Sequence, residues 1–205
     1  MKKILFIITM AVFCMSASGF GKFSKKETGL LKSAAASAVS KATKSIEFKT
    51  LPTTLEELKA MPEASLNDEY TVAALAVAVL CNYEKDPEET CRMMDFLDGP
   101  KEMTNADKQF LKDRLDGRSY VMRSYFKGAT PENNYTASTP YTVEVGQNTH
   151  SRDEKGYVKL FIQSSGADSP RPITLREKES TEQWFVWKNS LTTDVRKPAA
   201  DDPWK

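Results

Sequence analysis

The sequence predicts an α+β domain in which N-terminal helices pack on a C-terminal antiparallel sheet of about four to five strands. Two observations support this prediction. Residues 54–117 carry helix-start signals followed by apolar runs, whereas residues 120–187 consist of strand-like stretches separated by polar turns. Helices that precede strands in this way are typical of α+β domains with an antiparallel sheet.

Two helices are expected at the start of the domain. Residues 54–57 (TLEE) form a capping-box pattern, in which a threonine begins a short helix and a glutamate reaches back to it. Pro62 ends this helix, and Asn67 or Asp68 begins the next. Because residues 72–81 are apolar at every position, the second helix should be buried on all sides.

Two further helices follow. Residues 86–89 (DPEE) combine an aspartate cap, a proline at the first helical position and two acids at the positive end of the helix. Gly99 and Pro100 end this third helix. Residues 104–107 (TNAD) begin a fourth helix, which Gly117 ends.

The rest of the domain is expected to form the sheet. Residues 120–126 have the aromatic and β-branched composition of a strand. Polar turn segments then separate four more strands. These strands are expected at residues 141–145, 157–164, 173–175 and 184–187.

The first 19 residues have the organisation of a secretory signal peptide. A basic start precedes an apolar run at residues 4–17, and small residues follow it. The run is shorter than the ~20 residues that a membrane-spanning helix needs. Lipidation of Cys14 is not expected, because the bulky Phe13 precedes it. The chain is therefore predicted to be exported, to the periplasm or the exterior, without a membrane span after cleavage.

Low apolar content predicts that residues 20–50 form a flexible or weakly helical linker. A single α+β domain should then occupy residues 51–205. The whole chain carries 29 basic and 28 acidic residues. Such a near-neutral balance argues against nucleic acid, which needs a basic face to displace its counterions.

Cys81 and Cys91 are the two cysteines that remain after signal cleavage. An even pair in an exported chain is a disulfide candidate. The alternative is two buried thiols in a helical hairpin, since free cysteine packs as a small hydrophobic residue. The sequence contains neither a CxxC motif nor a Cys/His cluster, so no metal or other cofactor is predicted.

Two polar segments, residues 130–135 and 165–171, contain candidate binding residues. Both segments are rich in side chains that form hydrogen bonds with turns, so they are either rigid connectors or the rim of a pocket. In the second interpretation, an arginine could grip a carboxylate or phosphate with its planar fork. The candidate residues are Asn133, Asn134, Asp168 and Arg171.

Trp184 and Trp187 place aromatic side chains on both faces of the last strand. One face must pack on the helices. The other face is either covered by the C-terminal tail, residues 198–204, or open as a surface for a ligand or partner.

Four segments of the domain resemble an uncharacterised bacterial family described only as a domain of unknown function. They are TLPTTLEELKAMPEASL, RSYFKGATPENNYT, VKLFIQSSGADSPRPITLREK and EQWFVWKNSLTTDVRKPAADDPW. The resemblance spans about residues 51–204 and implies one module of bacterial origin, without an assigned activity. At the level of the fold, the chain is similar to the cystatin-like and nuclear-transport-factor-like α+β cones, which host enzymes and binding modules alike.

No set of residues in the sequence predicts catalysis. His150, the only histidine, lies in a polar turn and lacks a nucleophile elbow. The paired acids at residues 56–57 and 88–89 already have roles at helix starts. We therefore expect a non-enzymatic binding or interaction module with an unknown protein or small-molecule ligand. The alternative is a small hydrolase or lyase that uses carboxylates or Arg171 in a pocket of the cone.

Overall fold

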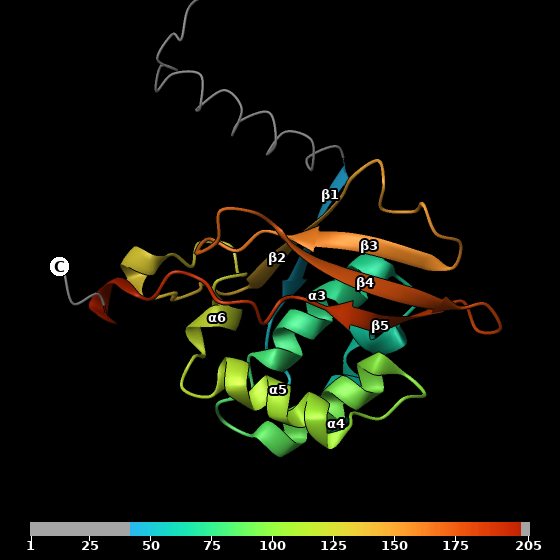
Figure 1. The fold of residues 1–205 in the computed structure, drawn as a ribbon, viewed down its shortest axis with the longest axis horizontal. Helices are drawn as coiled ribbons and strands as arrows, with labels where there is room; N and C mark the ends of the chain where they lie inside the picture. Colours follow the sequence, from blue (N-terminus) through green and yellow to red (C-terminus); the bar gives the residue numbers. More distant parts are fainter. Residues whose placement is uncertain (1–41, 202–205) are drawn as a thin grey trace, which may run out of the picture.

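The computed structural model describes residues 42–201 and shows one antiparallel sheet with helices on one of its faces (Figure 1). The strands lie in the order in which they occur along the chain, so each strand pairs with its neighbour in sequence. Their bounds are Ala42–Phe48 (β1), Tyr141–Gln147 (β2), Tyr157–Ile162 (β3), Arg171–Lys178 (β4) and Gln183–Asn189 (β5). The α+β class and the four predicted strands after residue 140 are confirmed.

The helices precede most of the sheet. They are α2 (Leu55–Ala60), α3 (Glu69–Leu80), α4 (Pro87–Asp98), α5 (Asn105–Leu115) and the single-turn α6 (Tyr120–Arg123). Each of the four predicted helix starts is confirmed, because the side chain of the expected cap accepts a hydrogen bond from the backbone N–H three residues later. These caps are Thr54, Asp68, Asp86 and Thr104.

Helix α3 lies against the sheet and forms the centre of the core. Its residues 72–80 are all buried, as their uniformly apolar sequence predicts. Helix α4 packs against α3 and also reaches β5. One face of the edge strand β5 is therefore covered by helices, and its other face is open.

Strand β1 was not expected. The prediction that residues 20–50 form a linker is wrong for residues 42–48, which pair with β2 along their whole length. Ile46 and Phe48 are buried, while Ser45 and Glu47 are exposed. This alternation is the sequence pattern of a half-buried strand, and the lysine- and alanine-rich residues before it conceal the pattern. The remaining predicted linker residues, and the predicted signal peptide, lie outside the described residues.

Residues 120–126 were expected to form a strand, and this prediction is wrong. Residues 120–123 form α6, and the only strand-like contact of the segment is a single bridge between Phe126 and Val143. Three consecutive residues, 120–122, are buried. A strand exposes alternate side chains to opposite faces, so a helical turn buries this run better than a half-buried strand would.

The C-terminal segment runs away from β5. Its last described turn, η3 (Ala199–Asp201), packs beside the turn η2 (Pro131–Asn133) at the opposite end of the molecule (Figure 1). Trp204 belongs to the C-terminal tail that is one of the two alternatives for covering the sheet, and it lies outside the described residues. Within residues 42–201, none of the helices has the length and apolar character needed to cross a membrane.

Candidate functional site

An irregularity in strand β5 places Trp187 at the surface. Val186 pairs with Leu175 and Lys188 pairs with Thr174, which leaves Trp187 as an extra residue without a partner on β4. A β-bulge of this kind bends the strand and redirects a side chain. The side chain of Trp187 is 47% exposed.

Trp187 contacts an aromatic and cationic cluster on the open face of the sheet. Its ring lies 5.9 Å from the ring of Tyr157 in an edge-on arrangement. The guanidinium of Arg176 lies 5.0 Å from the Trp187 ring centroid and 5.5 Å from that of Tyr157. Cation–π contacts at these distances orient the arginine side chain.

The opposite wall is the link between α4 and α5, which is held close to β5. Gly99 ends α4 with φ +82°, and a Cβ atom there would lie 2.7 Å from Cδ1 of Phe185. Only glycine fits both this backbone conformation and this approach. The carboxylate of Asp95 accepts a hydrogen bond of 2.7 Å from the backbone N–H of Met103, which fixes the rest of the link.

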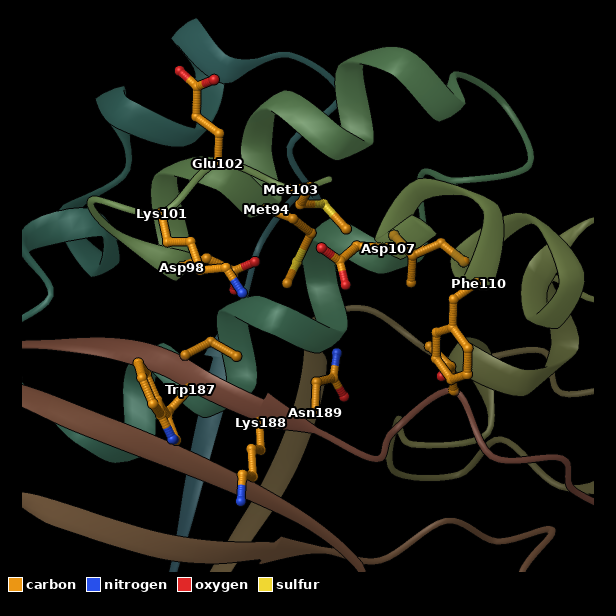
Figure 2. Close-up of a pocket in the computed structure, with 13 residues that line it drawn as sticks. Met94, Asp98, Lys101, Glu102, Met103, Asp107, Phe110, Trp187, Lys188 and Asn189 are labelled. Carbon is orange, nitrogen blue, oxygen red and sulfur yellow. The ribbon is translucent and has the colours of Figure 1, made fainter. Parts of the chain in front are cut away.

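A cleft with two lobes lies between these walls. The first lobe has a volume of about 370 Å³ and runs between α4, α5 and β5, while the second, of about 600 Å³, opens onto the outer face of the sheet. Trp187 lines both lobes. Figure 2 shows Trp187 and Phe110 at the two ends of the first lobe, with Asp107 and Asn189 extending into it from opposite walls. Both lobes are lined by Asp98, Lys101, Val186 and Trp187.

Asp98 is the most perturbed ionisable group of the cleft. The pKa of its carboxyl is raised to about 7, first by burial and then by the charges of Asp95 and Asp107, against the opposing charge of Lys101. No hydrogen bond or ion pair joins this carboxylate to another residue between 42 and 201. A perturbed carboxyl in a cleft is a candidate functional group.

Asp107 lies in the first lobe as well, but the pKa of its carboxyl is shifted in the opposite direction. Hydrogen bonds from the side chain and backbone of Thr104 lower the pKa of its carboxyl. These two bonds, of 2.7 and 2.9 Å, belong to the capping box of α5. Asp107 therefore has a structural role in addition to its place in the cleft.

Neither of the two asparagines proposed from the sequence lines this cleft. The side chain of Asn133 accepts from the backbone N–H groups of Thr130 and Thr136 and donates to the carbonyl of Gly128. Asn134 has φ +54° and accepts from the backbone N–H of Ala200. These contacts are those of rigid connectors, and a role in binding stays a prediction for both residues.

Asp168 and Arg171 do come together, in a shallow depression that neither asparagine lines. Arg171 donates to the backbone carbonyl of Asp194 at 3.2 Å, and Arg196 approaches Asp168 at 3.6 Å. The site is open to solvent and its charges are balanced within it. Binding there stays a prediction.

The remaining candidates have different environments. Trp184 is half-buried and packs against the core, whereas Trp187 is exposed. Cys81 and Cys91 are free thiols, and burial raises the pKa of the Cys81 thiol to about 12. His150 is exposed, with Nδ1 2.9 Å from an oxygen of Asp153. No group of three or more metal-ligating side chains occurs among residues 42–201.

The sequence interpretation missed Asp98, Phe110 and Arg176. One signal was available for Asp98, because it is the last residue of α4 and follows Asp95 in the same final turn, where no basic residue lies. Acids at the negative end of a helix are unfavourable. For Phe110 and Arg176 no local signal exists, since their positions depend on how α5 and β4 meet the bulged strand.

The comparisons with known proteins give one match. Residues 50–199 match the family model described as a domain of unknown function (DUF6935). None of the curated proteins and none of the solved structures matches the chain, and the likeness to cystatin-like and nuclear-transport-factor-like cones stays a prediction. The matched range covers most of the chain and includes the entire cleft, so the protein belongs to the DUF6935 family.

Proposed function

We propose that this protein is an exported binding module whose cleft beside Trp187 holds a carbohydrate chain without transforming it. One observation carries the proposal: Trp187 and Phe110, the two large hydrophobic side chains that are exposed within residues 42–201, line the same lobe of one cleft. Scattered exposed apolar residues are ordinary. Two of them facing one cavity, with polar groups between them, are typical of a ligand site.

The chemistry between the two rings suits a sugar. A pyranose presents C–H groups on its faces, which stack on aromatic rings, and hydroxyl groups at its edge. The carboxylates of Asp98 and Asp107 and the side-chain amide of Asn189 lie between the rings and can accept hydrogen bonds from such hydroxyls. Because the two lobes join at Trp187 and have volumes of about 370 and 600 Å³, the cleft has room for more than one sugar unit.

An extended peptide is a less suitable ligand. Peptides that add to a sheet edge depend on unpaired backbone groups of the edge strand. The outward edge of β5 is partly occupied already, since the backbone N–H of Trp184 donates to the carbonyl of Leu66 at 2.8 Å. This leaves side-chain recognition in the cleft as the main source of affinity.

Calorimetric titration tests the proposal. The purified chain is titrated with cellohexaose, chitohexaose and the neutral methyl ester of hexagalacturonate. We expect at least one to bind, and Trp187→Ala to weaken that binding by about 30-fold or more, as expected for an aromatic anchor. His150→Ala, a change at an exposed residue outside the cleft, is the matched control and should leave affinity unchanged. Failure of these three neutral oligosaccharides, and of the acidic hexagalacturonate and a hyaluronan hexamer, to bind would overturn the proposal.

A second function is favoured by the two aspartates of the first lobe. The pKa of Asp98 is raised and that of Asp107 is lowered, and carboxyls whose pKa values are pushed apart are suited to act as acid and base. In a glycoside hydrolase, Asp98 would protonate the leaving oxygen and Asp107 would assist the attack of water. Binding is the better-supported function, because the capping box already explains Asp107.

Product analysis separates the two functions. Incubation of each bound oligosaccharide with the protein, followed by mass spectrometry, should show no shortened products. Shortened products that disappear in Asp98→Asn, while that variant still binds the oligosaccharide, would establish the hydrolase in place of the binding module.

Export rests on the sequence of residues 1–19 and has its own experiment. N-terminal sequencing of the mature protein from a secreting host should begin near Gly19 or Phe20. An intact Met1, or a lipid attached to Cys14, would contradict export by cleavage at this site.

A further inference from the structure

The second lobe of the cleft is lined by three acidic side chains, Asp98, Glu177 and Glu179, and by a larger set of basic ones. None of the basic side chains makes an ion pair with another residue between 42 and 201. Arg176 extends from the open face of the sheet. The basic residues of this lobe are Lys101, Lys155, Arg176 and Lys178.

Arg176 differs from the three lysines because two aromatic rings restrict its position. Its guanidinium lies against the rings of Tyr157 and Trp187, at 5.5 and 5.0 Å from their centroids. Stacking of this kind leaves the edge of the guanidinium free, and that edge is a fork of N–H donors that matches a carboxylate. No hydrogen bond to another described residue occupies these donors. Part of the entropy of ordering this exposed side chain is therefore lost before a ligand arrives.

We infer that the second lobe holds the carboxylate of an acidic sugar, such as a uronic acid, while the neighbouring ring of the same chain stacks on Trp187. This inference rests on the proposed function, and it adds the class of sugar. Arg176 receives the carboxylate through its fork, and Lys155 and Lys178 increase the positive potential around it.

A polyphosphate is a poorer match for the complete cleft. The first lobe contains the carboxylates of Asp98, Glu102 and Asp107 against the two cations of Lys101 and Lys188, and this acidic excess disfavours a chain that carries a negative charge at every unit. The chain as a whole has a formal net charge of only +1, so release of counterions would contribute little to binding a nucleic acid. A ligand that presents hydroxyls to the first lobe and one carboxylate to the second lobe satisfies both.

Matched probes test the inference. Hexagalacturonate and a hyaluronan hexamer supply carboxylates, and their methyl esters have the same backbones without the charge. We expect at least one acid to bind about 10- to 100-fold more tightly than its ester, the range of one or two charge-assisted hydrogen bonds. Arg176→Gln should remove this preference and leave affinity for the ester unchanged. Arg176→Lys should restore part of it, and Arg118→Gln, the same change at an exposed arginine outside the cleft, should have no effect.

The outcomes separate the inference from the function on which it rests. Equal affinity for acids and esters would overturn the inference and leave carbohydrate binding standing, whereas no binding of any probe would overturn both. Binding of hexaglutamate or of a single-stranded oligonucleotide as tight as that of the acids would show a general polyanion site and overturn the inference. A loss of both acid and ester binding in Arg176→Gln, together with a lowered melting temperature, would show that Arg176 only supports Trp187, which also overturns it.

Discussion

Helix α3 and the cleft beside Trp187 differ in how far their local features agree with a stable fold. In α3, residues 72–80 are all buried apolar side chains and the N-terminal cap is satisfied, so every local preference agrees with the fold. In the cleft, two large aromatics are exposed, a strand is bulged, and an unpaired aspartate ends a helix. Each of these features costs stability, and departures from local consistency concentrate at functional sites. The comparison therefore supports the proposal that the cleft binds a ligand, whereas α3 contributes to stability.

The largest effect expected on the stability side comes from β1, which lies before the range matched by the family model. Phe48 is 1% exposed, so Phe48→Ala should lower the free energy of unfolding by ~3–5 kcal/mol. Urea unfolding measures this change. A chain that starts at Thr50 should also be less stable than one that starts at Ala42, because it loses the strand that pairs with β2. Equal stability of the two chains would place β1 outside the cooperative fold.

Leu75→Ala tests α3 itself. The side chain of Leu75 is fully buried, and its truncation leaves a cavity that should cost ~2–5 kcal/mol in the free energy of unfolding. Affinity for the ligand of the cleft should not change in the fraction that remains folded. A loss of less than ~0.5 kcal/mol would mean that α3 is not the tightly packed centre of the core.

The same contrast explains how much of the structure could be predicted. The caps at Thr54, Asp68, Asp86 and Thr104, the buried α3 and the four later strands follow from local patterns, and the structure confirms them. The cleft could not be predicted, because Phe110, Asp98 and Arg176 are distant in sequence and meet only through tertiary packing. Trp187 was identified from its residue type alone, since the bulge that exposes it depends on its register with β4.

Asp98→Asn should have the opposite sign from the core variants. The pKa of Asp98 is about 7 in the folded protein, against an ordinary value of 3.8. The folded state therefore binds this proton more tightly than the unfolded state, and stability is lost as the pH rises from about 4 to 7. Removing the charge should stabilise the protein at pH 8 by about 2 kcal/mol, which is below the ~4 kcal/mol that three pKa units represent, because the group is partly solvated.

The pH dependence provides the control for this prediction. At about pH 3 and below, the Asp98 carboxyl is neutral in both states, because its ordinary pKa is 3.8. Urea unfolding of the variant and the wild type should then coincide. Asp107→Asn is the matched variant, and it should destabilise the protein at pH 8 because the pKa of that carboxyl is lowered by its bonds to Thr104. A destabilised Asp98→Asn at pH 8 would show that the carboxylate of Asp98 has stabilising partners. Asp98 would then no longer count among the features of the cleft that cost stability.

The two tryptophans of β5 give the smallest effect on stability and the sharpest form of the comparison, because they differ by three positions on one strand. Trp187 is half exposed and contacts Tyr157 and Arg176 at the surface, so Trp187→Ala should change the free energy of unfolding by less than ~1 kcal/mol. Trp184 packs against the core, so Trp184→Ala should cost more stability. Affinity should respond in the reverse order, with binding of the oligosaccharide weakened in Trp187→Ala and retained in Trp184→Ala. Trp187→Ala could instead destabilise the protein as much as Trp184→Ala and leave affinity unchanged. In that case the bulge would serve only the packing of β5, and the contrast between the stable core and the binding cleft would not hold on this strand.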